Sequence, residues 1–189
     1  CYSKIMNDVD ILKKIEKKVL WLACWMIHNA NHIRENQDGL KVGGHQASSA
    51  SIVSIMTALY FNILRPEDRV AVKPHASPVF HAIQYLSGLQ TKEKIENFRG
   101  FGGAQSYPSR TKDIDDVDIS TGSVGLGVAM TSFVSLIQDY IVRKQFYKNK
   151  PLGRMIALVG DAELDEGNVY ECLQEGWKHD LRNVWWIID

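Results

Sequence analysis

The chain has 189 residues, of which 45% are hydrophobic, and its 22 basic and 22 acidic side chains leave a formal net charge of zero. A chain of this length and composition can bury a full hydrophobic core, and one domain is the simplest expectation. The balanced charge gives no reason to expect nucleic acid as a partner. The apolar runs are too short to span a bilayer and no signal peptide begins the chain, so no membrane partner is expected.

The three cysteines, Cys1, Cys24 and Cys172, have no CxxC spacing and cannot all pair with one another. This usage favours a reducing, cytoplasmic compartment over a disulfide scaffold. The sequence does not begin with methionine and ends in an apolar run typical of a strand. We therefore expect it to be a fragment of a longer polypeptide.

The first half of the chain predicts mainly helices. Apolar side chains recur at helical spacing over residues 9–36, and Gln37-Asp38-Gly39 ends that pattern. Further along, the patterns predict a helix over 48–64, a short strand over 69–73 that ends at Pro74-His75, and helices over 78–89 and 92–98. We expect an N-terminal helical segment at 1–38 and one larger domain over 39–189, truncated at its C-terminal end.

The second half predicts a strand–helix–strand unit. Residues 100–118 are rich in glycine, serine and charge, which indicates a surface loop, and a long helix is predicted over 123–146. Two apolar, strand-like runs at 154–159 and 184–189 flank an amphipathic segment. This alternation predicts an α/β fold with a doubly wound, mostly parallel sheet flanked by helices.

An acidic run, Gly160-Asp161-Ala162-Glu163-Leu164-Asp165-Glu166-Gly167, directly follows the first of these strands. Open parallel sheets bind ligands at the carboxyl ends of their strands. A loop built for nucleotides would place glycines and a helix N-terminus there, to attract phosphate. Carboxylates would instead repel a phosphate unless a divalent cation lay between the two charges. The run therefore predicts a metal-bridged diphosphate site.

Other motifs fall where this fold would place a pocket. Gly43-Gly44-His45 precedes a predicted helix with Ser48 in its opening turn, and His75 ends a predicted strand. The glycine-rich run 120–127 begins another helix, where its backbone could meet a diphosphate or a heteroaromatic ring. Each of these motifs also has a structural interpretation, as a solvated loop histidine or as a tight turn.

Two further patterns point more weakly to a site. His28 and His32 have the i, i+4 spacing of a zinc-binding pair, but Asn29 stands where a metalloprotease has glutamate and no third ligand is evident, so a polar helix face is favoured. The tryptophans are more typical of a core or a subunit interface than of a ligand box.

The motifs occur in a characteristic order: GGH, a strand ending in histidine, Ser106-Tyr107-Pro108, TGSVGLG and GDAELDEG. In this order they resemble the diphosphate-binding half of transketolase-like thiamine diphosphate enzymes, over residues from about 39 to 189. The segments 74–78 and 96–99 are more similar to the homodimeric decarboxylating component of pyruvate dehydrogenase. Transketolases usually have a histidine where Tyr107 stands. The resemblance implies the thiamine diphosphate-binding fold.

The resemblance also implies a site for thiamine diphosphate and Mg²⁺. Asp161 matches the family's metal ligand, Ala162 stands in place of the usual glycine of a GDG motif, and Glu163 matches a residue beside the diphosphate. The second metal ligand and the activating glutamate would lie beyond Asp189, so this fragment alone is expected to be inactive. The cofactor-binding positions implied are Ser48, Gly122, Val124, Gly125, Asp161, Ala162 and Glu163.

The catalytic positions implied are His45, His75, Tyr107 and Glu166. The bound cofactor attacks a carbonyl carbon, and an imidazole can stabilise or protonate the alkoxide that forms, the role implied for the two histidines. Glu166 and Glu171 match buried acids at the family's subunit interface, so a homodimer is expected.

Three functions remain open at this point. The first is an oxidoreductase that decarboxylates a 2-oxo acid such as pyruvate, with an acyltransferase as a further partner. The second is a transferase of the transketolase kind, which moves a two-carbon ketol unit between sugar phosphates; Lys73, Arg99 and Arg110 are the nearby cations that could anchor such a phosphate. The third is a non-catalytic scaffold domain, in which the histidines and acids would have no purpose.

Overall fold

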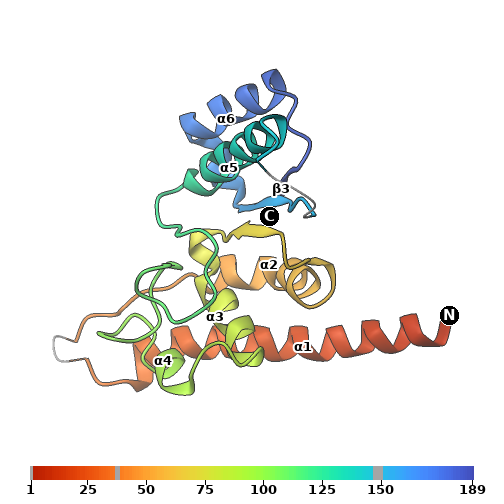
Figure 1. The fold of residues 1–189 in the computed structure, drawn as a ribbon. Helices are drawn as coiled ribbons and strands as arrows, with labels where there is room; N and C mark the ends of the chain where they lie inside the picture. The colour runs from red at the N-terminus through yellow and green to blue at the C-terminus, as the bar shows by residue number, and fades with distance from the viewer. Residues whose placement is uncertain (1, 37–38, 147–150) are drawn as a thin grey trace. The chain divides into compact units, whose positions relative to one another are not determined.

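The computed structural model describes residues 2–36, 39–146 and 151–189 (Figure 1). Its backbone divides into two compact units. The helical unit consists of Cys1–Leu64, His75–Ser106 and Thr111–Asp116, and the sheet unit of Arg65–Pro74, Tyr107–Arg110 and Val117–Asp189. Cys1 and the predicted domain boundary at Asp38 lie outside the described residues, so the division at 38/39 stays a prediction.

The helical unit confirms the helices expected in the first half of the chain. Its helices are α1 (Tyr2–His28), α2 (Gln46–Ala58), α3 (Ser77–Leu86) and α4 (Lys92–Glu96). One turn of π-helix extends α1 over Asn29–Ile33, and another extends α2 over Leu59–Ile63. The three longer helices pack against one another in pairs. The side chains of this core include Val19, Met26, Ile52, Met56, Val79, Phe80 and Ile83, all at most 2% exposed.

The segment 100–118, expected to be a surface loop, is irregular, and part of it is buried. Asp115 is buried against His81 of α3, whose Nδ1 lies 2.5 Å from the Asp115 carboxylate. The other ring nitrogen of His81 lies 3.0 Å from the carbonyl oxygen of Gln105, and the Gln90 amide donates to the second oxygen of Asp115. The Asp115 carboxylate therefore has a side-chain partner at each of its two oxygens.

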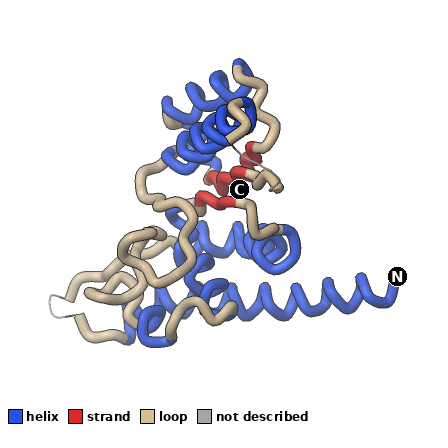
Figure 2. The backbone as a smooth tube through the Cα atoms, viewed as in Figure 1, coloured by secondary structure: helices blue, strands red, loops and turns tan. Residues whose placement is uncertain are grey.

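The sheet unit confirms the α/β fold with a parallel sheet. Its described residues form β1 (Arg69–Ala71), β2 (Met155–Val159) and β3 (Val184–Ile188), all parallel and in the order β1-β2-β3 (Figure 2). All five residues of β2 are buried, as expected for a central strand. The helices α5 (Leu126–Arg143) and α6 (Gly167–Lys178) lie side by side, and α5 packs against all three strands (Figure 1). The predicted strand–helix–strand unit is thus β2, α6 and β3.

Asp68 fastens the amino ends of β1 and β2 together. Its carboxylate accepts hydrogen bonds from the guanidinium of Arg154 and from the backbone N–H groups of Arg154 and Arg65. The Arg154 guanidinium also lies 4.3 Å from the ring centre of Trp185 on β3. Burial by itself raises the pKa of Asp68, but the hydrogen bonds from Arg154 and Arg65 outweigh it and hold that pKa well below its usual value.

No helix among the described residues is long and apolar enough to cross a bilayer.

We predict that Asp68→Asn lowers the free energy of unfolding at pH 7 by about 3 kcal/mol, because the largely buried Arg154 loses its counter-ion. The folded-state pKa of Asp68 is depressed, so its contribution is complete above about pH 4 and is lost as the pH falls through the folded value. Urea unfolding of the intact protein at pH 7 and pH 3 measures both effects. Asp180→Asn, which removes a partner from an exposed pair with Arg182, is the control. Equal losses for the two variants would contradict the prediction.

Candidate functional site

The carboxyl ends of the three parallel strands lie at one edge of the sheet, because adjacent parallel strands run in the same direction. This is the edge at which open α/β sheets bind ligands. Lys73 follows β1, Gly160 and Asp161 follow β2, and Asp189 follows β3. Charged side chains thus meet at the edge where the sequence predicted a diphosphate site.

Lys73 and Asp189 form a buried ion pair across the end of β2. The Lys73 ammonium donates to Asp189 Oδ2 at 2.6 Å, and each side chain is only 8% exposed. The lysine passes over Gly160, where a Cβ atom would lie 3.1 Å from Lys73 Cε. Gly160 has an ordinary φ of −75°, so glycine is favoured there by space and not by conformation. The sequence predicts Lys73 only as a possible phosphate anchor, and no sequence pattern indicates that Asp189 is its partner.

Glu163 lies in the 3₁₀ turn Asp161–Asp165 that follows β2, and it is 9% exposed. Its Oε2 accepts a hydrogen bond from the backbone N–H of Gly160 at 2.7 Å, and its Oε1 accepts one from the backbone N–H of Gly125 at 3.1 Å. Gly125 begins α5 with a φ of +79°, a conformation that favours glycine. One carboxylate therefore joins the acidic turn to the glycine-rich start of α5.

Asp161 and Ala162 are exposed at the same turn. The backbone N–H of Asp161 donates to the carbonyl oxygen of Asp189 at 3.0 Å, which fixes the start of the turn against the end of β3. The Asp161 carboxylate accepts a local bond, from the Ala162 N–H at 2.9 Å. Among the described residues, no three histidine, cysteine or acidic side chains are grouped as a metal site.

Tyr107 and Gly122 lie next to each other in the sheet unit. The Thr121 N–H donates to the carbonyl oxygen of Pro108 at 3.1 Å, and the Arg110 N–H donates to Ser120 Oγ at 2.9 Å, so the two segments run together. A Cβ atom on Gly122 would lie 3.7 Å from the Tyr107 ring. Val124, two residues further on, is half-buried.

His45 and His75 stack in the helical unit, with ring centres 4.1 Å apart and planes at 30°. His45 caps the start of α2 and is exposed, whereas His75 lies half-buried in the short turn before α3. Gly43 and Gly44 have φ values of +82° and +136°, so the chain entering His45 favours glycine at both positions. The two catalytic candidates from distant parts of the sequence are thus in contact.

Ser48 lies in the opening turn of α2, as predicted. Its hydroxyl oxygen is buried and has no hydrogen-bond partner among the described residues. A buried polar atom without a partner calls for an explanation, and a ligand that bonds to it is one.

Arg99 is a residue whose part in this arrangement the sequence did not reveal. Its guanidinium donates to the carbonyl oxygen of Val42 at 3.0 Å and lies against Gly43, which holds the segment leading into His45. Burial, the neighbouring His75 and the positive charge of Arg99, in that order, lower the pKa of His45. His45 is therefore neutral over a wider range of pH than an ordinary histidine.

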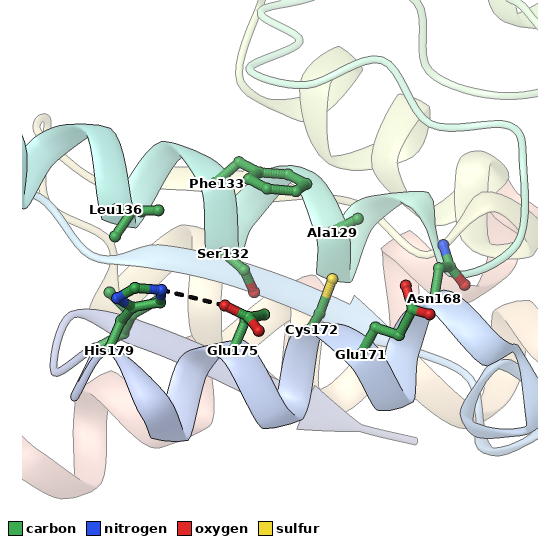
Figure 3. Close-up of a pocket in the computed structure, with 10 residues that line it drawn as sticks. Ala129, Ser132, Phe133, Leu136, Asn168, Glu171, Cys172, Glu175 and His179 are labelled. Carbon is green, nitrogen blue, oxygen red and sulfur yellow. Dashed lines mark hydrogen bonds and ion pairs between the residues drawn. The ribbon is translucent and has the colours of Figure 1, made fainter.

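Glu166 and Glu171 are both exposed on or next to α6. Glu171 lines a groove between α5 and α6, together with Phe133 and Leu136 of α5 and Cys172 of α6 (Figure 3). Burial, with smaller contributions from Glu171 and Glu175, raises the pKa of the Cys172 thiol. The groove is apolar, with acids along its α6 side.

The candidate residues thus fall into two sets, one in each unit. The helical unit holds His45, Ser48 and His75, with the two histidines in contact. The sheet unit holds Tyr107, Gly122, Val124, Gly125, Asp161, Ala162, Glu163 and Glu166.

Comparison with known proteins identifies the family. A family model described as 1-deoxy-D-xylulose-5-phosphate synthase matches residues 6–188. The chain belongs to this family. Its motifs, including the acidic turn after β2 and the glycine-rich start of α5, all fall inside the matched range.

The curated relatives include the pyruvate dehydrogenase E1 component of Mycolicibacterium smegmatis, 26% identical over 97% of this chain, and that of Pseudomonas aeruginosa, 27% identical over 99%. Transketolase-like protein 2 of Mus musculus is 29% identical over 77% of the chain. These matches cover 20%, 22% and 24% of the respective relatives, so the chain spans about a fifth to a quarter of their length.

Solved structures show the same fold. Transketolase from Leishmania mexicana superposes with a TM-score of 0.79 at 18% identity, over 94% of this chain and 27% of that one. A transketolase variant from Pichia stipitis gives a TM-score of 0.79 at 20% identity, over 95% and 27% of the two chains. The predicted resemblance to transketolase-like enzymes and to the pyruvate dehydrogenase component is confirmed.

We predict that His75→Gln raises the pKa of His45 toward its ordinary value of 6.5, because it removes one of the neighbours that lower it. Histidine-detected NMR titration of the intact protein measures the shift. His179→Gln, on α6 beside Glu175, should leave the pKa of His45 unchanged and is the control. An unaltered His45 titration in the His75 variant would show that the stacked pair does not interact electrostatically.

Proposed function

We propose that this chain is part of a thiamine diphosphate- and magnesium-dependent enzyme that decarboxylates a 2-oxo acid, with pyruvate as the first candidate. The observation that carries the proposal is the acidic turn Asp161–Asp165, which leaves the carboxyl edge of a parallel sheet and bonds to the glycine-rich start of α5. The pyruvate dehydrogenase relatives support the choice of substrate. The cytoplasmic location stays a prediction from cysteine usage.

The charges at this edge fit a divalent cation. Asp161, Glu163 and Asp189 carry three negative charges beside the one positive charge of Lys73, an arrangement that would repel a diphosphate. Oxygen ligands and substrate phosphates are the usual partners of Mg²⁺. Glu163 and Asp189 are engaged inside the unit, whereas Asp161 is exposed, so Asp161 is the carboxylate that we assign to the metal.

Backbone and hydroxyl groups would hold the rest of the cofactor. When bound, thiamine diphosphate supplies a carbon nucleophile for the carbonyl carbon of the substrate. In the sheet unit, the exposed Gly122 has no side chain to cover its backbone. In the helical unit taken by itself, the Ser48 hydroxyl lacks a partner among the described residues, which supports its predicted part in cofactor binding. We assign the remaining contacts to the backbone at Val124, Gly125 and Ala162, and treat Glu163 separately below.

His45 and His75 are the groups that we assign to proton transfer at the carbonyl oxygen of the substrate. A histidine whose pKa is lowered is neutral at pH 7 and, once protonated, gives up its proton readily. The neighbouring His75, whose ring centre lies 4.1 Å from that of His45, contributes to the lowering of the His45 pKa, after burial. Tyr107 contributes a phenol, which suits a small 2-oxo acid better than a phosphate.

A second copy of the chain is the partner that we propose for the face formed by α5 and α6. Apolar side chains are exposed on both helices, and one of them, Phe133, lines the groove of Figure 3. Exposed apolar surface can mark an interaction site. Glu166, at the start of α6, belongs to this interface in our proposal, and an acyltransferase is proposed as a further partner. The exposed apolar residues are Phe133, Ile137, Tyr140, Tyr170 and Trp177, each at least 55% exposed.

A transferase acting on sugar phosphates is the second candidate, because the family description names a sugar phosphate. Such a substrate needs cations for its phosphate. Of the three nearby candidates, Lys73 is engaged by Asp189 and Arg99 by the carbonyl oxygen of Val42, whereas Arg110 is exposed. This favours the 2-oxo acid. A scaffold without chemistry is the least favoured candidate, given the contact between His45 and His75.

We predict that Asp161→Asn weakens the binding of thiamine diphosphate in the presence of Mg²⁺ by at least about tenfold, since even residues that only orient a metal ligand change affinity by that much. Calorimetric titration of the intact protein, with and without Mg²⁺, measures the change. Asp165→Asn removes an exposed carboxylate from the same turn and is the control. Metal-independent, wild-type affinity in the Asp161 variant would overturn the metal assignment.

We predict that the kcat/KM of the intact enzyme is about a hundredfold higher with pyruvate as donor than with xylulose 5-phosphate. The ratio of these two values measures how strongly an enzyme discriminates between substrates. Reduction of an artificial electron acceptor by the intact enzyme reports the decarboxylation without partner proteins. A preference for the sugar phosphate would move the chain to the transferase reading, while the cofactor and metal assignment would stand. No turnover of either donor in an intact protein that binds the cofactor would favour the scaffold.

A further inference from the structure

The carboxylate of Glu163 is bonded to the backbone of its own unit, whereas a residue that binds a cofactor directly would turn its carboxylate toward the ligand. Both of its oxygens accept backbone N–H bonds within the sheet unit, from Gly160 at 2.7 Å and from Gly125 at 3.1 Å, and the residue is 9% exposed. We propose that Glu163 is a positioning residue, which sets the spacing between the acidic turn after β2 and the start of α5. This inference rests on the proposed function, because the spacing matters only if both segments bind one ligand.

The two bonds are of the strong kind. A carboxylate that accepts from a backbone N–H forms a charge-assisted hydrogen bond, roughly twice as strong as a neutral one. The Gly160 bond is local, closing the turn three residues before Glu163, whereas the Gly125 bond joins segments 38 residues apart. One side chain therefore fixes the turn and at the same time anchors it to another segment.

Both glycines are also closely packed by other side chains. A Cβ atom on Gly160 would lie 3.1 Å from Lys73 Cε, and one on Gly125 would lie 2.5 Å from Oδ1 of Asn168 on α6. Glu163 therefore bonds to two backbone segments that are packed within the sheet unit, and the length of its side chain sets the gap that its two bonds span.

The distance between Gly160 and Gly125 affects the proposed ligand contacts, because the residues proposed to bind the ligand are adjacent to these glycines. Asp161, the proposed metal ligand, directly follows Gly160, and Val124 directly precedes Gly125. If the two segments move apart, contacts to a shared ligand weaken although no contacting group has been removed. A positioning role thus predicts a loss of affinity from any change in the length or in the acceptors of this side chain.

Two substitutions separate length from charge. Glu163→Asp keeps the charge but is one methylene shorter, so it cannot reach both N–H groups. Glu163→Gln keeps the length but turns an NH₂ group toward one of the two donors, which breaks that bond. A residue that acted by its charge on the metal would tolerate the aspartate and not the glutamine, whereas a positioning residue tolerates neither.

The test compares both variants with the wild type in the intact protein, by two measurements. Amide hydrogen exchange without cofactor follows the Gly125 and Gly160 N–H groups, and calorimetry with Mg²⁺ follows the affinity for thiamine diphosphate. We expect exchange at the bonded glycines to accelerate, and affinity to fall, by about tenfold in both variants, as loss of one hydrogen bond implies. Protection of the β2 amides should persist and shows that the variants fold, and Asp165→Asn should change neither quantity.

Three outcomes would overturn the positioning role. They are wild-type affinity in Glu163→Asp, unchanged exchange at both glycines, and faster exchange with unaltered affinity, which would make the contact structural only. In each of them the wild type still binds the cofactor, so the proposed function survives. A wild type that binds no thiamine diphosphate overturns the proposed function and this role together.

Discussion

The candidate site in the sheet unit depends on one interaction: the Glu163 carboxylate accepts hydrogen bonds from two backbone N–H groups. Gly160 and Gly125 would otherwise have buried donors without partners, which costs free energy and is rare in folded proteins. The bonds in turn give each oxygen of this buried carboxylate a hydrogen-bond donor. The turn that carries Asp161 is therefore held by the backbone of its own unit before any ligand arrives.

Of the three acids considered at this edge, two are bonded within the sheet unit and Asp161 is exposed. Glu163 binds backbone groups, and Asp189 neutralises Lys73 across the end of β2. Asp161 is exposed beside them. Its backbone N–H donates to the carbonyl oxygen of Asp189, which fixes the start of the turn. An outward carboxylate on a rigid, negatively charged edge suits a divalent cation, and a cation is what a diphosphate needs there. Because these acids follow the carboxyl ends of the strands, the sheet determines where the negative charge of the site lies.

Local pattern predicted much of this structure, and contacts between distant residues account for what it missed. The helices, the parallel strands and the acidic turn follow from periodicity and from the order of motifs, which are local properties. The partners of Glu163, Lys73 and His81 lie 38, 116 and 34 residues away, so no local pattern could identify them. The segment 100–118 has the composition of a solvated loop, and Asp115 is buried there because side chains of His81 and Gln90 lie within bonding distance of its carboxylate.

We propose that metal and diphosphate bind the edge of the sheet together, with the cation offsetting the charge of the acids and of the diphosphate. The most direct test measures the affinity of the intact protein for thiamine diphosphate and for unphosphorylated thiamine, each with and without Mg²⁺. The account predicts that Mg²⁺ tightens the binding of thiamine diphosphate strongly and leaves that of thiamine unchanged, because only the diphosphate meets the acids. An equal effect of Mg²⁺ on both ligands, or none on the diphosphate, would contradict it.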